Sequence, residues 1–397
     1  MFKRINIIFI VVMLPLLNVV SQEPIFSNFS PTMNFINPSL IAVSNNWSLK
    51  FIRRDQWMRI PSKLTTNGFS FETSVGQFGY AISYSQNIEG ELSFKNQDFS
   101  SGFSLSLPIR KSTNIRFGVS GRLLTRSIDY SNITFFGNLD PILGNVNSIN
   151  YSLSNPSNSF TELNPDISCG LGINYHKSNP VNRDLSFNSF KLGISVNNLL
   201  KQEKGLISSS INYVNFSNFP FPMKFTIYGF NEFLYSNNSV LNNPKSTYFS
   251  QSYFYQISGP LSTFQINLIN IDNGPFDMGV GYRSQGISIN EYIKRESIIC
   301  NLGFQKINPT SSLTLGLSYD FTISQLNNIS SGGTFEIMLI IESITGGIFD
   351  SYFSEAKLKK WRKKQVQCSR LGRPTYSKRL EGFSKKKKLF NTNMGKM

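Results

Sequence analysis

The sequence predicts an all-β fold, a transmembrane antiparallel β-barrel with fourteen strands. Three observations indicate this fold: segment after segment alternates apolar with polar residues, aromatic residues are many while charged residues are few, and long connections alternate with short ones. Most of the alternating segments have about ten residues, the length that a tilted strand needs to cross the hydrocarbon layer. Together these features favour a lipid-facing exterior and a polar interior.

The alternation is clearest in residues 313–323, where Leu, Tyr, Phe and Ile alternate with Thr, Gly, Ser and Asp. Successive side chains of a strand point to opposite faces, so one face of this segment is apolar and the other polar. Similar segments recur back to Trp47. The predicted strands are residues 47–55, 64–74, 77–87, 98–109, 113–127, 165–176, 185–197, 223–235, 245–257, 261–272, 275–284, 297–306, 313–323 and 334–343.

Composition supports a membrane barrel over a soluble β protein. The 397 residues include 35 Phe and 16 Tyr, and only 16% are charged, which is typical of outer-membrane barrels. A soluble β-sandwich or propeller would also show alternating strands, but it would carry a charged exterior. The charged residues on the polar faces, expected to point into the lumen, are Arg116, Arg122, Arg126, Asp277 and Arg283.

The connections between the predicted strands differ at the two ends of the barrel. On one side they are mostly long, at positions 56–63, 88–97, 128–164, 198–222, 258–260, 285–296 and 324–333. The intervening turns are shorter, at positions 75–76, 110–112, 177–184, 236–244, 273–274 and 307–312. Outer-membrane barrels place their short turns in the periplasm, so we expect an outer-membrane protein with its N- and C-termini in the periplasm. The tight turn Ser258-Gly259-Pro260 on the long-loop side is an exception that one miscounted strand would explain.

Residues 1–21 resemble a signal peptide. Lys3 and Arg4 precede an apolar run, and Val19 and Ser21 supply the small residues that cleavage after Ser21 requires. The run is shorter than the ~20 residues of a membrane-spanning helix. Residues 22–46 follow as an irregular N-terminal lead-in, expected to close one end of the barrel, and residues 47–343 form the barrel itself.

Residues 344–397 form a basic tail, expected to be periplasmic. Positions 356–397 contain fifteen Lys and Arg and one acidic residue, Glu381, a formal charge of +14 out of +16 for the chain. Two interpretations stay open: a solvated, disordered extension, or a tether for an acidic partner, peptidoglycan or an anionic lipid surface. Nucleic acid is not expected as a partner, because export removes the chain from the cytoplasm. The candidate tether residues are Lys357, Lys359, Lys360, Arg362, Lys363, Lys364, Lys385, Lys386, Lys387 and Lys388.

The sequence offers little catalytic chemistry. His176 is the single histidine and falls near the end of a predicted strand, without a nucleophile motif beside it. Cys169, Cys300 and Cys368 lack metal-binding spacing, and no glycine-rich phosphate loop is present. We therefore expect no catalytic residue, no cofactor and no metal site.

Several short motifs resemble the PorP/SprF proteins of the type IX secretion system. The pairs Phe26-Ser27 and Asn37-Pro38 and the motif Arg54-x-Gln56-Trp57 are similar, in order and spacing, to the start of the mature family members. Residues 281–283, 315–324 and 331–339 resemble the family's closing strands. Ser39, where the family has alanine, and Phe335, where it has histidine, depart from the pattern. The family-motif positions are Phe26, Ser27, Asn37, Pro38, Arg54, Gln56, Trp57, Tyr319, Asp320 and Glu336.

The resemblance implies a non-enzymatic outer-membrane component that supports secretion or surface retention of client proteins, including gliding adhesins in motile bacteria. It implies as partners other secretion components, among them a periplasmic peptidoglycan-binding protein, a secreted surface protein as client, and membrane lipid. Residues 128–164 and 198–222 are the expected client-facing loops. Two other functions stay open: a passive or substrate-specific transport barrel for small or hydrophobic molecules, and a barrel enzyme of the lipase or protease type.

Overall fold

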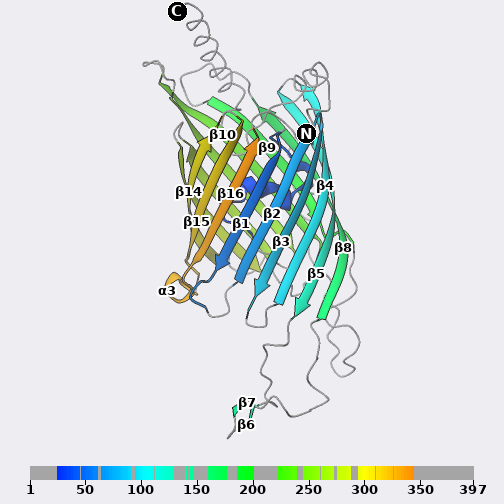
Figure 1. Ribbon diagram of the computed structural model, residues 1–397. Coiled ribbons are helices and arrows are strands. Elements are labelled where there is room, and N and C mark those ends of the chain that lie inside the picture. Colours follow the sequence, from blue (N-terminus) through cyan, green and yellow to red (C-terminus); the bar gives the residue numbers. More distant parts are fainter. Residues whose placement is uncertain are drawn as a thin grey trace, which may run out of the picture.

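Fourteen antiparallel strands close into a barrel in the computed structural model (Figure 1). Each strand pairs with the next along the chain, and the first strand pairs with the last to close the cylinder. The strands are β1 (Ser48–Gln56), β2 (Leu64–Val75), β3 (Phe78–Glu89), β4 (Phe94–Arg110), β5 (Thr113–Ile128), β8 (Phe160–His176), β9 (Ser186–Asn197), β10 (Lys224–Asn238), β11 (Lys245–Ser258), β12 (Leu261–Ile271), β13 (Phe276–Ile287), β14 (Lys294–Ile307), β15 (Ser311–Thr322) and β16 (Thr334–Ser343).

Two further short strands, β6 (Leu139–Asp140) and β7 (Gly144–Asn145), pair with each other within the connection between β5 and β8. The structure describes residues 25–44, 46–60, 64–90, 94–110, 112–128, 139–140, 144–145, 160–176, 186–200, 222–238, 245–259, 261–271, 275–287, 294–308, 310–324 and 326–343. The basic tail and positions 1–24 lie outside these ranges.

The predicted fold and the number of barrel strands are confirmed. The largest differences are at strand starts: β4 begins at Phe94 instead of residue 98, and β8 at Phe160 instead of residue 165. Ladder pairing there continues through polar residues, such as Lys95 opposite Ser127, after the apolar alternation has ended. The tight turn after Ser258 does join β11 to β12, so no strand was miscounted.

The two ends of the barrel carry different connections (Figure 1). The end that carries residues 57–60 and the short helix α3 (Asn328–Ser331) is here named the long-loop end; β9 ends and β10 begins there as well. The opposite end, named the short-turn end, carries the two-residue turns after β2 and β4. The strand β16 ends at the short-turn end.

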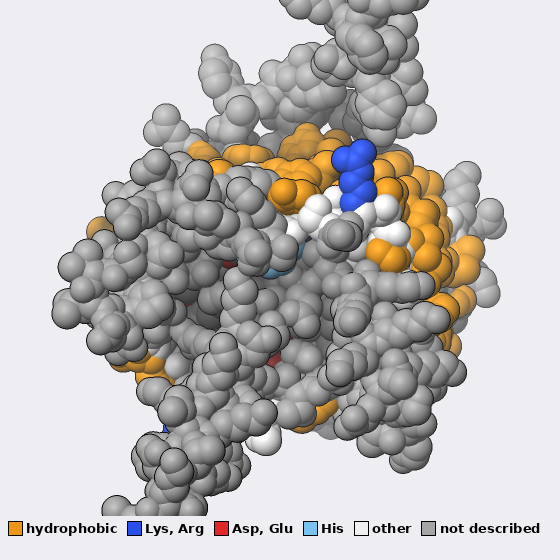
Figure 2. Space-filling view, turned by 90° about the horizontal axis from the view of Figure 1, so that it is seen from above, with side chains coloured by type: hydrophobic (Ala, Val, Ile, Leu, Met, Phe, Trp, Pro, Cys, Tyr) orange, Lys and Arg blue, Asp and Glu red, His pale blue; other side chains and the backbone are white. Residues whose placement is uncertain are grey.

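The outer wall is apolar and the lumenal wall is polar. Phe103, Met278 and Val280 are each more than half exposed on the outside, and Figure 2 shows hydrophobic side chains around the barrel's circumference. On the inward face, Ser, Thr, Asn and Gln side chains are buried. This is the arrangement of a barrel that meets lipid outside. Among the residues that the structure describes, no helix is long and apolar enough to cross a membrane.

Residues 25–44, named here the lumenal segment, lie inside the barrel. They contain three helical turns, η1 (Ser30–Thr32), α2 (Met33–Ile36) and η2 (Pro38–Leu40), where the sequence predicted an irregular lead-in closing one end. The turns have a local cause, because η1 and η2 each begin around a proline and the Asn37 side chain accepts a hydrogen bond from the Ser39 N–H. Turn η2 packs against β4, β5, β8 and β9.

Candidate functional site: the lumenal segment and its anchors

Apolar side chains hold the middle of the lumenal segment. Phe29 is fully buried, with its ring centroid 6.1 Å from that of Tyr228 and 5.6 Å from that of Phe254. Met33 belongs to the same cluster, together with Phe230. Three aromatic residues of β10 and β11 therefore point inward, where a polar lumen would not need them. They are explained by the segment that covers them, because burial of aromatic surface stabilises the packed state.

A second apolar cluster surrounds Phe26. Its ring lies 5.8 Å from that of Phe35 in an edge-on arrangement, and it packs against Ile52, Met338 and Ile340. Because Met338 and Ile340 are lumenal, β16 is apolar on both faces at this level. The two clusters show that parts of the barrel interior are built to receive the lumenal segment.

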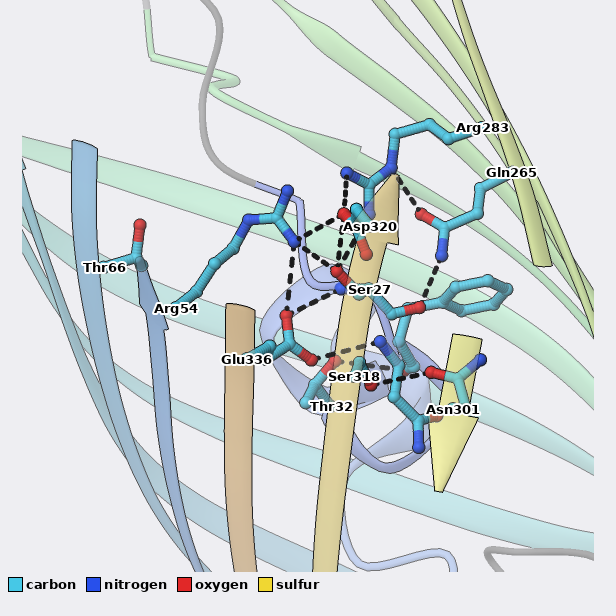
Figure 3. A network of polar contacts seen from close by, with 12 residues as sticks. Ser27, Thr32, Arg54, Thr66, Gln265, Arg283, Asn301, Ser318, Asp320 and Glu336 are labelled. Carbon is cyan, nitrogen blue, oxygen red and sulfur yellow. Dashed lines mark hydrogen bonds and ion pairs between the residues drawn. The ribbon is translucent and has the colours of Figure 1, made fainter. Parts of the chain in front are cut away.

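Ser27 is the most densely bonded residue of the lumenal segment (Figure 3). Its backbone N–H donates to a Glu336 carboxylate oxygen at 2.7 Å, and its hydroxyl donates to Asp320 Oδ2 at 2.8 Å. Its carbonyl accepts from the side-chain amides of Gln265 at 2.6 Å and Asn267 at 2.9 Å. Every polar group of this fully buried residue has a partner, as a buried site requires.

Four buried charges surround Ser27. Arg54 Nη1 lies 3.1 Å from Asp320 Oδ2 and 3.5 Å from Glu336 Oε2, and it also contacts the Ser27 hydroxyl. Arg283 Nη1 lies 3.1 Å from the same Asp320 oxygen. Each of these four side chains is at most 2% exposed. Arg283 Nη1 also lies 3.6 Å from Glu296 Oε1, so two cations meet three anions. Buried ion pairs gain little net stability over apolar packing, but losing one partner leaves an uncompensated charge. The network therefore fixes the position of Ser27.

A second polar anchor lies on β1 and β2. Lys50 forms a buried ion pair with Glu72, and its Nζ donates to Asn34 Oδ1 at 2.6 Å. The other carboxylate oxygen of Glu72 accepts the backbone N–H of Ala42 at 2.7 Å. One buried pair thus contacts the lumenal segment at two separate points, Asn34 and Ala42.

A third anchor lies on β4 and β5. Arg116 Nε donates to the Ser39 carbonyl at 2.7 Å, and its Nη2 donates to the Ile41 carbonyl at 2.5 Å. Ser104 donates to the same Ile41 carbonyl at 2.9 Å. These donors satisfy carbonyl groups that the short helical turn leaves without backbone partners.

The barrel wall approaches η2 so closely that only glycine fits. A Cβ on Gly118 would lie 2.1 Å from the Pro38 carbonyl carbon, and one on Gly170 would lie 1.9 Å from Asn37 Oδ1. The Asn37 amide donates to the Ile194 carbonyl at 3.1 Å. Glycine in strand interiors marks such close backbone approach.

Five of the family-motif positions meet in one place. Phe26, Ser27, Arg54, Asp320 and Glu336 form the network and cluster described above, although the first three precede or open the barrel sequence and the last two close it. Asn37 and Pro38 lie in the lumen as well, at η2, where they meet Gly170 and Gly118.

The other three motif positions lie outside this network. Trp57 donates its backbone N–H to the Gly333 carbonyl at 2.8 Å, and the Tyr319 hydroxyl donates to Gly332 at 3.1 Å, so both support the connection that carries α3. Gln56 ends β1, opposite Thr334. The ten candidate tether residues of the tail lie outside the described residues.

Sequence reasoning did not identify several anchor residues. Lys50, Glu72, Gln265 and Asn267 were not singled out, and Arg116 was expected only to line the lumen. One signal was available: in β16, Met338 and the residues flanking it are all apolar, which breaks strict alternation. Apolar residues on both faces of a strand indicate that another part of the chain packs against its lumenal face.

The residues considered for catalysis lie apart from this network. His176 ends β8, and its backbone N–H donates to the Ser112 carbonyl in the turn before β5. Cys169 and Cys300 are exposed on the outer wall and are not joined by a disulfide. Among the described residues, no group of three His, Cys, Asp or Glu side chains could hold a metal ion.

Fold and site define a class: an outer-membrane β-barrel whose lumen holds its own N-terminal segment. The sequence model of the type IX secretion system membrane proteins PorP/SprF matches residues 18–341. The chain therefore belongs to the PorP/SprF family. No match was found among curated protein sequences.

Solved barrel structures are similar to this chain at low identity. The CymD monoaromatic hydrocarbon channel shares 11% identity at a TM-score of 0.39, covering 82% of this chain and 94% of that one. Omp33 of Acinetobacter baumannii shares 8% at 0.35, covering 76% and 99%. A Pseudomonas aeruginosa FadL homologue shares 10% at 0.39, covering 79% and 93%. Similarity at this level carries no inference about function.

Arg54 and Arg53 provide a matched test of the buried network. Arg54→Gln removes the cation shared by Asp320 and Glu336, and we expect it to lower the free energy of unfolding by about 3–5 kcal/mol. Arg53 lies on the other face of β1 with its side chain 55% exposed, so Arg53→Gln should change it by no more than about 1 kcal/mol. Urea titration of the folded barrel in lipid vesicles measures both. Equal losses of unfolding free energy in the two variants would contradict the assigned role of the network.

Gly118 and Gly121, both on β5, provide a matched test of close packing against η2. A side chain on Gly118 would overlap Pro38, whereas a Cβ on Gly121 meets nothing within 4 Å. We expect Gly118→Leu to displace the lumenal segment and raise single-channel conductance in planar bilayers. Gly121→Leu should conduct like the unmodified protein. Unchanged conductance in a folded Gly118→Leu barrel would show that the segment does not close the lumen.

Proposed function

We propose that this protein is a non-enzymatic outer-membrane component of the type IX secretion system that supports secretion or surface retention of specific client proteins and links to periplasmic machinery. One observation carries the proposal: the lumen is occupied by residues 25–44, tied to the wall by buried charges. A barrel filled in this way suits a rigid scaffold. Family membership supports a place in the secretion system.

A transport barrel fits the structure less well. Passive transport needs a continuous path, whereas anchors on several sides of the lumen hold the lumenal segment across it. Moving the segment aside would expose its apolar clusters and break the hydrogen bonds of Ser27 to Asp320 and Glu336. Each of these changes costs free energy that simple diffusion of a solute does not supply.

The asymmetry of the connections supports an orientation. We place the short-turn end in the periplasm and the long-loop end at the cell surface, as in other outer-membrane barrels. Strand β16 ends at the short-turn end, so the basic tail would continue into the periplasm. A periplasmic N-terminus stays a prediction, since Phe26 and Ser27 contact strand residues toward the long-loop end.

The proposal assigns different roles to the two ends. Residues 128–164 and 198–222 would face the client at the surface, since loops carry recognition while strands supply the scaffold. The tail would contact other secretion components, with a peptidoglycan-binding protein as the proposed periplasmic partner. Gliding adhesins are the proposed clients in motile bacteria.

Deletion of the gene tests the secretion role. We expect the deletion strain to lose one or more secreted proteins from its surface or medium, because the barrel is proposed to support their secretion or retention. Quantitative mass spectrometry of both fractions measures the loss, and complementation with the full chain should restore it. An unchanged set of secreted proteins would refute the proposed function.

Truncation after Ser354 tests the tail as a tether. The shortened protein should assemble normally but lose a periplasmic partner in crosslinked pull-downs, because the +14 charge of residues 356–397 would supply the attraction. The association of the full chain should weaken as salt rises, since the Debye length falls to ~3 Å at 1 M. Identical partners with and without the tail would show that it is a passive extension.

A further inference from the structure

A cavity lies between the lumenal segment and the long-loop end. Its empty volume, open solvent at the mouth included, is about 1230 Å³. Ile25, Phe26, Phe35 and Ile36 of the lumenal segment line it on one side. The strand residues that line it cluster where β3, β9 and β11 end and where β10 begins, which places the cavity at the long-loop end.

The cavity is open at one side, so a bound segment could continue out of the barrel. A secreted protein could thus place part of its chain in the cavity while the rest stays outside.

The cavity lining combines an apolar side with amide walls. Phe254 and Leu124 extend the apolar surface that the lumenal segment provides. An amide side chain both donates and accepts hydrogen bonds, which matches the alternating N–H and C=O groups of a peptide backbone. The amide residues whose side chains line the cavity are Asn87, Asn96, Asn197, Asn198 and Gln256.

Charge in the cavity does not favour an anionic ligand. Arg122 forms an ion pair with Asp98 and lies 3.8 Å from Asp166, so its charge is already balanced. The lining also holds Arg126 and Lys224, so its three cations face the acids Asp98 and Glu89, and Asp166 beside Arg122 completes the balance. A phosphate or an anionic lipid headgroup would need an excess of cations, as it binds through charge-assisted bonds. A neutral, hydrogen-bonding ligand with an apolar part fits better.

Closure of the barrel restricts how a peptide could bind. Peptides often add a strand to an exposed sheet edge, but the fourteen barrel strands are all paired on both sides. A peptide in the lumen must therefore satisfy its backbone through side chains, which the amide walls supply.

Asn198 is fixed in place at the rim of this cavity. It adopts a left-handed backbone conformation with φ of 59°, and its N–H donates to Asp166 at 2.9 Å. Its amide accepts from Arg122 and donates to the Pro222 carbonyl, both at 3.1 Å. A side chain that is already held in place loses little conformational entropy when a ligand binds beside it.

We propose that this cavity binds an extended peptide segment of a secreted client, with an aromatic or large aliphatic side chain against Phe26, Phe35 and Phe254. The proposal rests on the proposed secretion function and adds the site of recognition. The amides hold the peptide backbone, and the apolar surface selects the side chain.

Photocrosslinking in living cells tests this site. A photoreactive amino acid replaces Gln256, which lines the cavity, and in a control strain it replaces the adjacent Tyr255, which is exposed on the outer wall. We expect the full-length protein to crosslink to a secreted protein from position 256 and not from position 255. Mass spectrometry should locate the crosslink on a client peptide that contains a large apolar residue. Crosslinks from position 256 to this chain alone, to small molecules alone, or to nothing would overturn the proposal.

Filling the cavity gives a second measurement. Ser85→Trp places a bulky side chain in the cavity, whereas Gln86→Trp puts the same residue on the opposite face of β3. In folded barrels, Ser85→Trp should reduce retained client at least about tenfold, equivalent to about 1.4 kcal/mol, and Gln86→Trp should not. If gene deletion removes the client but Ser85→Trp does not, the cavity assignment fails and the secretion role stands. If deletion has no effect, both fail.

Discussion

The buried charge network around Ser27 is the constraint on which the arrangement of the lumen depends. Arg54, Arg283, Asp320 and Glu336 come from four strands and meet one serine of the lumenal segment. None of these charges has access to water, so each requires the others in place. The apolar clusters bury most of the surface of the lumenal segment, but apolar packing tolerates small shifts of the segment. The hydrogen bonds and ion pairs of the network depend on direction, so they set where the segment lies.

Most of the fold could be predicted from the sequence, because a lipid-facing barrel requires apolar residues at every second position along its strands. The segment 313–323 illustrates this: its apolar residues face outward and its polar residues inward, as expected. The strand ends were less predictable, since ladder pairing in β4 and β8 continues among polar residues that show no alternation. At these strand ends, backbone hydrogen bonding continues the strand, and the side-chain pattern does not mark where it stops.

The candidate site was only partly predictable. The motif residues Ser27, Arg54 and Glu336 could be selected by resemblance, but nothing in their spacing shows that they touch. Contacts across a lumen depend on register around the whole barrel, which local patterns do not encode. Glu72 shows the limit clearly: a charged residue inside a strand can be explained by water in the lumen or by a bound segment. Only the fold shows that it binds the N–H of Ala42.

The lumenal segment also sets an order of assembly. Ser27 is made early, yet its partner Glu336 lies 309 residues later and belongs to the last strand. The segment cannot reach its final bonds until β15 and β16 have joined the sheet. Such distant contacts make folding slow, because a long loop must close before the contact forms. Phe26 and Ser27 therefore reach their final contacts only when the last strands close the cylinder, whereas the anchors on β1, β2 and β5 do not need those strands.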